Sequence, residues 1–362
     1  MTVRPLRVAL LVDRKAWVLS TVAEAICLHA GGRLGLTFEI QPAPQSRSEN
    51  ARFQGGFDLL HFLSPGDFYR LAPAVVRPSV VTVHHVATRI RERFPPMAGL
   101  ADAVTSTNEA CGAFLRDLPA LGGKTVWSTP LGIDADFFRP IPGAARAVRE
   151  RFGIPDSAKL IGLSAKTDSN EDDRKGFDRY WALLRSLAKD EIRLLILGPG
   201  PDQTGGWREE LIPEDVRPKV VLAGFQPFEE LPRLYSALDF YVCLSRIEGG
   251  PYPVKESMAC ETPVISTPVG VVPSLIEDGQ SGFIVDESNF IARTTQLLRA
   301  PRPDAVGKSG RTSVVAKISW ATCASAERYR GIYDAAVENW KRRGLTERVG
   351  RGMRDLLARV KR

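Results

Sequence analysis

The chain has 362 residues, which is too long for one ordinary hydrophobic core and suits two α/β domains. Its hydrophobic share of 44% and charged share of 25% match an average globular protein and exclude a disordered or fibrous class. The net charge is +7, but residues 341–362 alone hold nine basic and two acidic side chains. The body of the chain is therefore neutral, and the tail carries the whole excess.

The longest early apolar run, Val8 to Val12, ends at Asp13. Because it is too short for a signal-peptide core or a membrane span, we expect a cytoplasmic protein. The cysteines are odd in number and show no CxxC or His-paired metal spacing, which favours buried free thiols. They are Cys27, Cys111, Cys243, Cys260 and Cys323.

The first part of the chain alternates apolar runs with helical patterns. Apolar residues spaced along one face predict an amphipathic helix over residues 19–30. Alternation of strands and helices implies a parallel sheet. The predicted strands are Leu6–Val12, Leu36–Ile40, Phe57–Leu63, Ser79–His84 and Ala103–Ser106.

After a turn-rich connector at residues 130–140 the pattern starts again, with helices predicted at 177–188 and 229–238. We therefore predict two Rossmann-like, doubly wound domains at 1–138 and 139–318. Ligands of such sheets bind beyond the carboxyl ends of the strands, so the pair should share a cleft. The second set of strands is Leu160–Ala165, Arg193–Leu197, Lys219–Ala223, Phe240–Leu244, Pro263–Thr267 and Gly282–Val285.

Two carboxylates eight positions apart, Glu248 and Glu256, flank a Gly-Gly-Pro-Tyr-Pro run. The preceding strand places Glu248 in a loop. Because Pro251 and Pro253 suit a loop and a first helical turn, we predict a helix from about Val254 to Cys260 with Glu256 in its first turn.

A helix N-terminus beside Gly249 and Gly250 favours phosphate, and carboxylates accept hydrogen bonds from paired hydroxyls. The local chemistry therefore favours a sugar that carries a phosphate. The alternative is that Glu256 only complements the helix dipole and that Glu248 is a solvated loop acid.

This stretch resembles the Glu-x7-Glu segment of the retaining glycosyltransferases of family 4, also called glycosyl transferases group 1, which commonly reads E-G-F-G-x-P-x-x-E-A-M-A-x-G-x-P-V. The matching positions are Glu248, Gly249, Pro253, Glu256, Met258, Ala259, Pro263 and Val264. The lead-in also matches at Gly224-Phe225, Leu231, Leu234-Tyr235, Asp239 and Ser245, as do Gly270, Glu277-Asp278-Gly279 and Gly282. The resemblance covers residues 130–285.

The resemblance implies a GT-B fold and transfer of a sugar, with retention, from a nucleoside diphosphate sugar to a glycan, lipid-linked or small-molecule acceptor. Glu256 would hold the ribose of the donor, and Glu248 would face the transferred sugar. Gly249, Gly250, Tyr252 and Pro253 would belong to the donor-binding segment. We expect no cofactor, no metal and no nucleic acid partner.

In the family, an Arg and a Lys of the second domain meet the charge of the departing diphosphate. By resemblance, Lys175 takes the place of the Lys, while Lys166 stands where Arg is usual and exchanges a bidentate fork for a point charge. Arg174 is a candidate to compensate. The alternative for all three is a plain surface cation.

Two histidines are candidates in the first domain. His84 follows a predicted strand at the place where the family has a His that contacts the donor or the reacting sugar. His61 matches the family pattern less well, and a lone histidine at the end of a strand is more often structural.

Two departures from the family are visible. The Gly-Gly loop after the first strand is replaced by residues 13–17, which puts diphosphate contacts from the first domain in doubt. Glu261 replaces a Gly after the helix that holds Glu256, where positive φ is common.

Two other functions remain open: a nucleotide-sugar 2-epimerase on the same architecture and a non-catalytic nucleotide-sugar sensor. The sequence argues against a dehydrogenase, because no G-x-G-x-x-G follows a strand with the right acid beyond it. From Ser319 a helical pattern, crossing back to the first domain as in the family, runs into the basic tail. Residues 341–362 predict an amphipathic helix that either contacts an anionic membrane, at the inner membrane face, or packs on the first domain.

Overall fold

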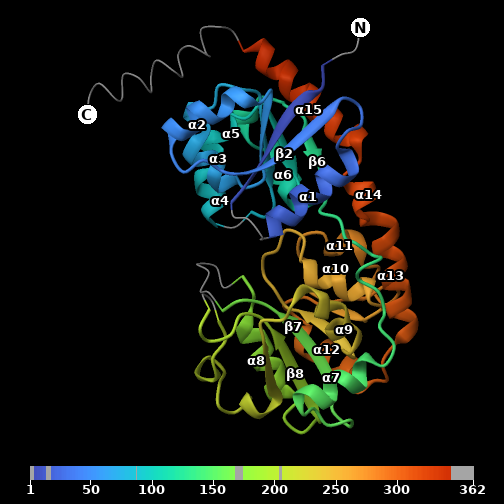
Figure 1. Ribbon diagram of the computed structural model, residues 1–362. Helices are drawn as coiled ribbons and strands as arrows, with labels where there is room; N and C mark the ends of the chain where they lie inside the picture. Colours follow the sequence, from blue (N-terminus) through green and yellow to red (C-terminus); the bar gives the residue numbers. More distant parts are fainter. Residues whose placement is uncertain (1–3, 14–17, 87, 168–173, 204–205, 344–362) are drawn as a thin grey trace. The chain divides into compact units, whose positions relative to one another are not determined.

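The computed structural model describes residues 4–13, 18–86, 88–167, 174–203 and 206–343. The chain forms two compact units, Met1–Gly132 with Trp320–Arg362, and Ile133–Ser319. Each unit is a six-stranded parallel sheet with helices packed on it (Figure 1). The predicted α/β class, with two Rossmann-like sheets, is confirmed.

The first unit has the strand order β2-β1-β3-β4-β5-β6, so the direction of winding reverses between β1 and β3. The strands are β1 Leu6–Val12, β2 Leu36–Pro42, β3 Leu59–Phe62, β4 Ser79–Val83, β5 Ala103–Ser106 and β6 Val126–Ser128. The helices are α1 Val18–Ala30, α2 Arg47–Phe53, α3 Pro65–Leu71, α4 Thr88–Arg93, α5 Pro95–Ala98, α6 Glu109–Arg116, α14 Trp320–Cys323 and α15 Ala326–Arg342.

The second unit has the order β12-β11-β10-β7-β8-β9, and its winding reverses between β7 and β10. The strands are β7 Lys159–Ser164, β8 Ile192–Leu197, β9 Val220–Gly224, β10 Phe240–Cys243, β11 Val264–Ser266 and β12 Phe283–Ile284. The helices are α7 Ala144–Phe152, α8 Phe177–Ser186, α9 Leu231–Ser236, α10 Tyr252–Ala259, α11 Val272–Leu275, α12 Phe290–Arg299 and α13 Asp304–Ile318. A ligand of this sheet is expected at the reversal, beyond the carboxyl ends of β7 and β10.

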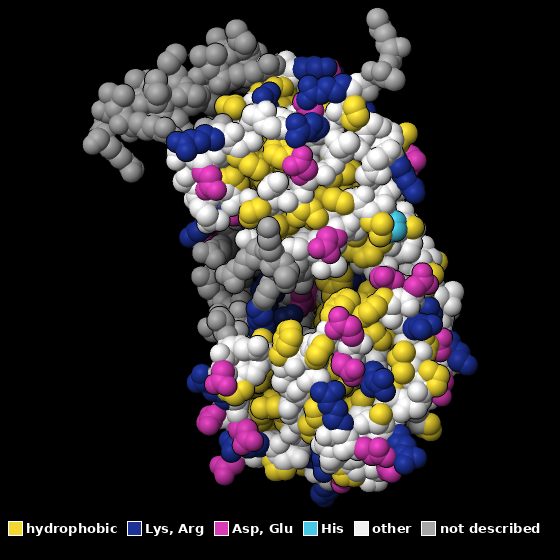
Figure 2. Space-filling view, in the orientation of Figure 1, with side chains coloured by type: hydrophobic (Ala, Val, Ile, Leu, Met, Phe, Trp, Pro, Cys, Tyr) yellow, Lys and Arg dark blue, Asp and Glu magenta, His cyan; other side chains and the backbone are white. Residues whose placement is uncertain are grey.

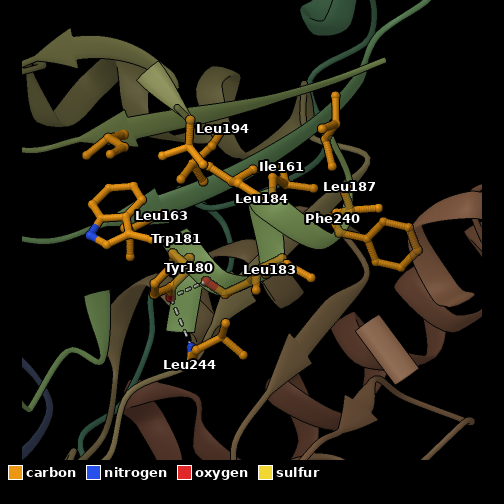
Figure 3. Close-up of a cluster of buried hydrophobic side chains, with 14 of the residues drawn as sticks. Ile161, Leu163, Tyr180, Trp181, Leu183, Leu184, Leu187, Leu194, Phe240 and Leu244 are labelled. Carbon is orange, nitrogen blue, oxygen red and sulfur yellow. Dashed lines mark hydrogen bonds between the residues drawn. The ribbon is translucent and has the colours of Figure 1, made fainter. Parts of the chain in front are cut away.

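A buried apolar cluster between α8 and the sheet fixes the end of β10 (Figure 3). The Tyr180 hydroxyl donates a hydrogen bond to the carbonyl oxygen of Val242 and accepts one from the backbone N–H of Leu244, both at 2.9 Å. Because Tyr180 is 0% exposed, these bonds are shielded from water. The loop that follows β10 therefore starts from a rigid point.

The turn after α10 has the geometry that the family's glycine would favour. Glu261 has φ +57°, and its N–H bonds the carbonyl oxygen of Met258 while the N–H of Thr262 bonds that of Ser257. This pair of bonds is a Schellman motif. The helix thus ends with a non-glycine residue, Glu261, in the left-handed region.

All five cysteines lie in the described part of the chain and are free thiols; four are buried, and Cys27 is half-buried. Among the described residues, no helix is long and apolar enough to cross a membrane. On the face drawn in Figure 2, lysines and arginines are interspersed with acids. Residues 344–362, most of the predicted basic helix, lie outside the described residues.

Candidate functional site

The segment that holds both predicted carboxylates follows β10 at the reversal of the second sheet. Helix α10 begins at Tyr252, with Pro251 at the N-cap and Pro253 in the first turn. Glu256 is therefore in the second turn, and the prediction of a first-turn position is wrong by two residues. A carboxylate in the second turn interacts only weakly with the helix dipole. This weakens the alternative in which Glu256 only complements that dipole.

Glu256 is a buried carboxyl group with one strong partner. Its side chain is only 7% exposed, and the Tyr235 hydroxyl donates a hydrogen bond of 2.8 Å to Oε2. Burial raises the pKa of Glu256 to about 7, while the Tyr235 hydrogen bond and the charge of Lys255 act to lower it. Sequence reasoning gave Tyr235 no role, although its match to the family lead-in was the available signal.

Glu248 forms an ion pair with Lys175, the cation predicted to meet the diphosphate. Lys175 Nζ lies 2.6 Å from Glu248 Oε1, and the side chains are 24% and 11% exposed. The hydroxyl of Ser245 donates to the same Oε1 at 3.1 Å. The structure thus brings together two of the predicted residues, at the carboxyl end of β10.

Hydrogen bonds and an ion pair hold the loop after β10 against the segment that contains Lys175. The N–H of Arg246 bonds the carbonyl oxygen of Arg174 at 2.7 Å, and its guanidinium grips both oxygens of Asp178 at 2.7 and 2.8 Å. Gly176 has φ +65°, and a Cβ on it would lie 2.5 Å from the carbonyl oxygen of Leu244. Only glycine permits this approach, which explains the glycine after Lys175.

The other predicted cations lie on neighbouring loops. Lys166 follows β7, next to Thr167, whose hydroxyl donates to the carbonyl oxygen of Gly206 at 3.0 Å. Lys166 and Arg174 are each half-buried and engaged in interactions within the protein. Neither bears on the Lys175 pair through a hydrogen bond or an ion pair that the structure defines.

The glycines of the predicted donor segment pack closely on the loop after β11. A Cβ on Gly270, which has φ +55°, would overlap the carbonyl oxygen of Gly249, and one on Gly250 would touch Val271. The backbone around Gly249 is thereby fixed on one side.

A second feature of this sheet edge is a pocket of about 410 Å³ beyond β8 and β9. Its lining includes Ile196, Pro199, Gly200, Trp207, Leu222 and Gly224.

In the first unit, His84 lies directly after β4. Its Nε2 lies 2.7 Å from the carbonyl oxygen of Leu63, so this nitrogen carries the proton and donates. The backbone carbonyl oxygen of His84 accepts hydrogen bonds from Thr107 Oγ1 and Asn108 Nδ2, both at 3.0 Å. The imidazole and its backbone are therefore held in place at the carboxyl edge of the sheet.

His61, in contrast, lies inside the first unit as part of a polar chain. The side chain is 0% exposed; Nε2 is 2.8 Å from Thr82 Oγ1, and Nδ1 is 3.1 Å from the hydroxyl of Tyr333 in α15. Thr105 and Thr129 continue the chain at 2.8 and 3.0 Å. The position indicates that His61 ties helix α15 to the sheet.

The buried His61 is expected to contribute a loss of stability on acidification. Burial, the largest cause, and the charge of His84 lower the pKa of His61 from 6.5 to about 3. Below pH 6.5 the unfolded chain takes up a proton that the folded chain refuses, so stability present above that pH is lost on acidification. Between pH 6.5 and 5 the loss from His61 alone is roughly 1–2 kcal/mol in the free energy of unfolding.

Denaturant titrations across that pH range measure the effect. His61→Gln should remove this contribution, so that the slope of stability against pH differs from wild type by up to about one proton, and His29→Gln, a half-exposed histidine on α1, is the control. A His61→Gln curve parallel to the wild type would contradict the buried neutral imidazole.

In the part of the chain that the structure describes, no group of three or more His, Cys, Asp or Glu side chains is placed to hold a metal ion. The described site offers a carboxylate and ammonium pair, a buried carboxyl group and glycine backbone.

Comparison with known proteins bears on both sequence and fold. Residues 161–300 match the family model described as Glycosyl transferases group 1. The chain is 31% identical over 208 residues to the GDP-mannose-dependent alpha-(1-6)-phosphatidylinositol monomannoside mannosyltransferase of Mycolicibacterium smegmatis, a match that covers 53% of this chain and 52% of that protein. It is 26% identical over 325 residues to the D-inositol 3-phosphate glycosyltransferase of Stackebrandtia nassauensis, covering 81% and 71%. The chain thus spans about half the length of the first of these relatives.

Solved structures share the fold. Sucrose-phosphate synthase from Thermosynechococcus elongatus has a TM-score of 0.73 at 20% identity, covering 91% of this chain and 100% of that one. HepE from Anabaena, in complex with UDP-glucose, has a TM-score of 0.72 at 14% identity with the same coverage. The two Rossmann-like units therefore have the GT-B fold, and residues 161–300 are similar to the group 1 glycosyltransferases.

Proposed function

We propose that this protein is a retaining glycosyltransferase that moves a sugar from a nucleoside diphosphate sugar to a hydroxyl of a glycan, lipid-linked or small-molecule acceptor. The observation that carries the proposal is the Lys175–Glu248 pair at 2.6 Å. Glu248 lies in the loop before α10 and Lys175 in the loop before α8, both within the part of the chain that matches the family model.

In the proposed reaction the bond between the anomeric carbon and the diphosphate oxygen breaks, and its electron pair stays on the phosphate. The acceptor oxygen forms the new bond on the same face of the sugar. Its proton passes to the departing phosphate oxygen, so no side chain has to act as the base. Negative charge grows on the diphosphate and positive charge on the anomeric carbon, and fixed charges of opposite sign stabilise both.

The described side chains supply these charges. Lys175, with Lys166 and Arg174 as further cations, meets the diphosphate, and Glu248 stabilises the sugar as its anomeric carbon becomes positive. When the diphosphate takes Lys175, Glu248 loses its counter-charge and becomes a stronger acceptor for the sugar. Glu256 accepts hydrogen bonds from the ribose hydroxyls. We keep His84 as a ligand of the sugar, on the strength of its family position and its fixed imidazole.

The backbone of the segment from Gly249 to Pro253 completes the proposed donor site. Gly249 and Gly250 leave room for a phosphate to approach the N–H groups at the start of α10, and Tyr252 opens that helix. The relatives suggest which donors to try first. The mannosyltransferase is GDP-mannose-dependent by name, and HepE was solved with UDP-glucose.

The test is a thermal-shift screen of nucleotide sugars, with GDP-mannose and UDP-glucose first, in buffer with and without EDTA. A donor at about 100 times its Kd should stabilise the protein by about 2.7 kcal/mol. EDTA should leave the shift unchanged, because the proposal uses cations of the chain in place of a metal. Loss of every shift in EDTA would contradict the metal-free scheme, and no shift from any donor would contradict the function.

The acceptor and the location of the protein are proposed from the names of the relatives and from the sequence. Both relatives carry an inositol group in their names, which makes a phosphorylated or lipid-linked inositol a reasonable acceptor to test. A peripheral contact with an anionic membrane through residues 341–362 stays a prediction, since residues 344–362 lie outside the described part of the chain. A cytoplasmic location stays a prediction as well.

A further inference from the structure

The two carboxylate oxygens of Glu256 have different surroundings. The Tyr235 hydroxyl donates a hydrogen bond to Oε2 at 2.8 Å, and the two side chains are 1% and 7% exposed. Within the described residues this is the one hydrogen bond of the carboxyl group, and Oε1 is not fully buried. One oxygen is therefore held by the protein, while the other keeps some access to solvent.

Tyr235 is itself fixed in place. It lies in α9, and its ring packs edge-to-face against the ring of Tyr241 in β10, with centroids 6.0 Å apart. The ring of Phe138, which precedes α7, lies at 6.3 Å. Thr262 Oγ1, just after α10, donates to the backbone carbonyl oxygen of Tyr235 at 2.7 Å. The hydroxyl is thus a rigid donor, tied to the helix that holds Glu256.

Glu256 needs a rigid donor because its own side chain does not set the plane of the carboxylate. The terminal torsion of a glutamate is broad and roughly two-fold, so the group can rotate unless a neighbour holds it. A carboxylate offers about four acceptor positions on its two oxygens. The bond from Tyr235 uses one of them and leaves the others for paired hydroxyls, such as those of a ribose. An acceptor that is oriented in advance lowers the entropy cost of binding.

We propose that Tyr235 is a positioning residue of the donor site, whose hydroxyl holds Oε2 of Glu256 so that Oε1 faces the ribose hydroxyls of the donor. The inference rests on the proposed function, with Glu256 as the ribose ligand. Tyr235 touches the carboxylate and not the donor in this assignment. Burial raises the pKa of Glu256 to about 7, and the hydrogen bond from Tyr235 acts to lower it, which favours the ionised acceptor.

The charged residue next to Glu256 in the sequence, Lys255, has a different position. Its side chain is 0% exposed, and Nζ lies 3.6 Å from the centroid of the Tyr252 ring, in cation–π contact. Glu256 receives no hydrogen bond or ion pair from it in the described part of the chain. The orientation of the carboxylate is therefore assigned to Tyr235.

Calorimetry with GDP, UDP and the dideoxy form of each, which lacks both ribose hydroxyls, tests this role. Measurement at about pH 9 keeps Glu256 ionised, since its pKa is about 7. The wild type should bind the ribose form of its nucleotide at least about tenfold more tightly than the dideoxy form. Tyr235→Phe keeps the ring and loses only the hydroxyl. It should weaken binding of the ribose form roughly tenfold and leave the dideoxy form unchanged, whereas a structural defect would weaken both.

Tyr333→Phe is the matched control, because it removes a buried hydroxyl that lies 3.1 Å from His61 Nδ1 in the first unit. It should leave both affinities unchanged. In a Glu256→Ala background no carboxylate remains to be positioned, so adding Tyr235→Phe should cause no further loss. This background gives a result even if Tyr235→Phe alone does not fold, because no buried charge is left without a partner.

The outcomes separate the inference from the proposed function. An equal loss for the ribose and dideoxy forms in Tyr235→Phe, or a further loss in the Glu256→Ala background, would overturn the positioning role. Equal binding of the two forms by the wild type would also overturn it, because Glu256 would then not be a ribose ligand. Absence of any nucleotide binding to the wild type would instead reject the proposed function.

Discussion

Gly176→Ala is expected to destabilise the protein by roughly 3 kcal/mol and to weaken donor binding more than tenfold. Gly176 has φ +65°, which costs an alanine about 1–2 kcal/mol. The added Cβ would also lie 2.5 Å from the carbonyl oxygen of Leu244, a backbone atom at the rigid end of β10. The loop must move away, and Lys175 moves with it from its 2.6 Å contact with Glu248. Thermal unfolding and donor calorimetry measure the two effects.

Gly153→Ala is the control for this substitution. Gly153 also has a positive φ, +63°, in the same unit, but nothing lies within 4 Å of a Cβ built there. It should therefore show the backbone cost alone, about 1–2 kcal/mol, with donor binding unchanged. If Gly176→Ala behaved like Gly153→Ala in both measurements, the close approach to Leu244 would not be what places Lys175.

The sheets could be predicted from the sequence because most strands are buried on both faces. Strands β1 and β5 have their predicted ends, since a continuous apolar run bounded by polar residues is typical of a buried parallel strand. The exception is β6, three half-exposed or exposed residues at the sheet edge, which was not predicted. Its Val126, Trp127 and Ser128 show no pattern that distinguishes a strand from a loop.

The sequence nominated residues for the candidate site but not the contacts between them. The family pattern pointed to Glu248 and Lys175, yet their ion pair joins residues 73 positions apart, which no local pattern gives. The predicted start of α10, at about Val254, was two residues too late, because proline is accepted at the N-cap as well as within the first turn. The burial of Lys255 could not be predicted either, because a lysine beside a glutamate usually indicates a solvated face.

The second large effect concerns the two carboxylates, which should fail in different ways. Glu248→Gln should lower turnover tenfold to more than a hundredfold, the range for losing one charge-assisted interaction of about 1.5–3 kcal/mol. Donor affinity should change little, because in this variant Lys175 does not have to break an ion pair before it binds the diphosphate. Glu256→Gln should instead weaken donor binding by at least about tenfold, because the ribose hydroxyls lose an ionised acceptor.

Donor calorimetry gives the affinities, and release of nucleoside diphosphate in the presence of hydroxyl acceptors gives turnover. Glu229→Gln, an exposed acid of the same unit, controls for loss of one negative charge. The contrast follows from the environments of the two groups. Glu248 is paired with a cation that the donor needs, whereas Glu256 is buried beside Tyr235 and gains its hydroxyl partners only from the donor. Unaltered affinity and turnover in both variants would mean that neither acid serves a donor. A Glu248→Gln variant that bound donor normally and kept full turnover would remove Glu248 from the proposed reaction.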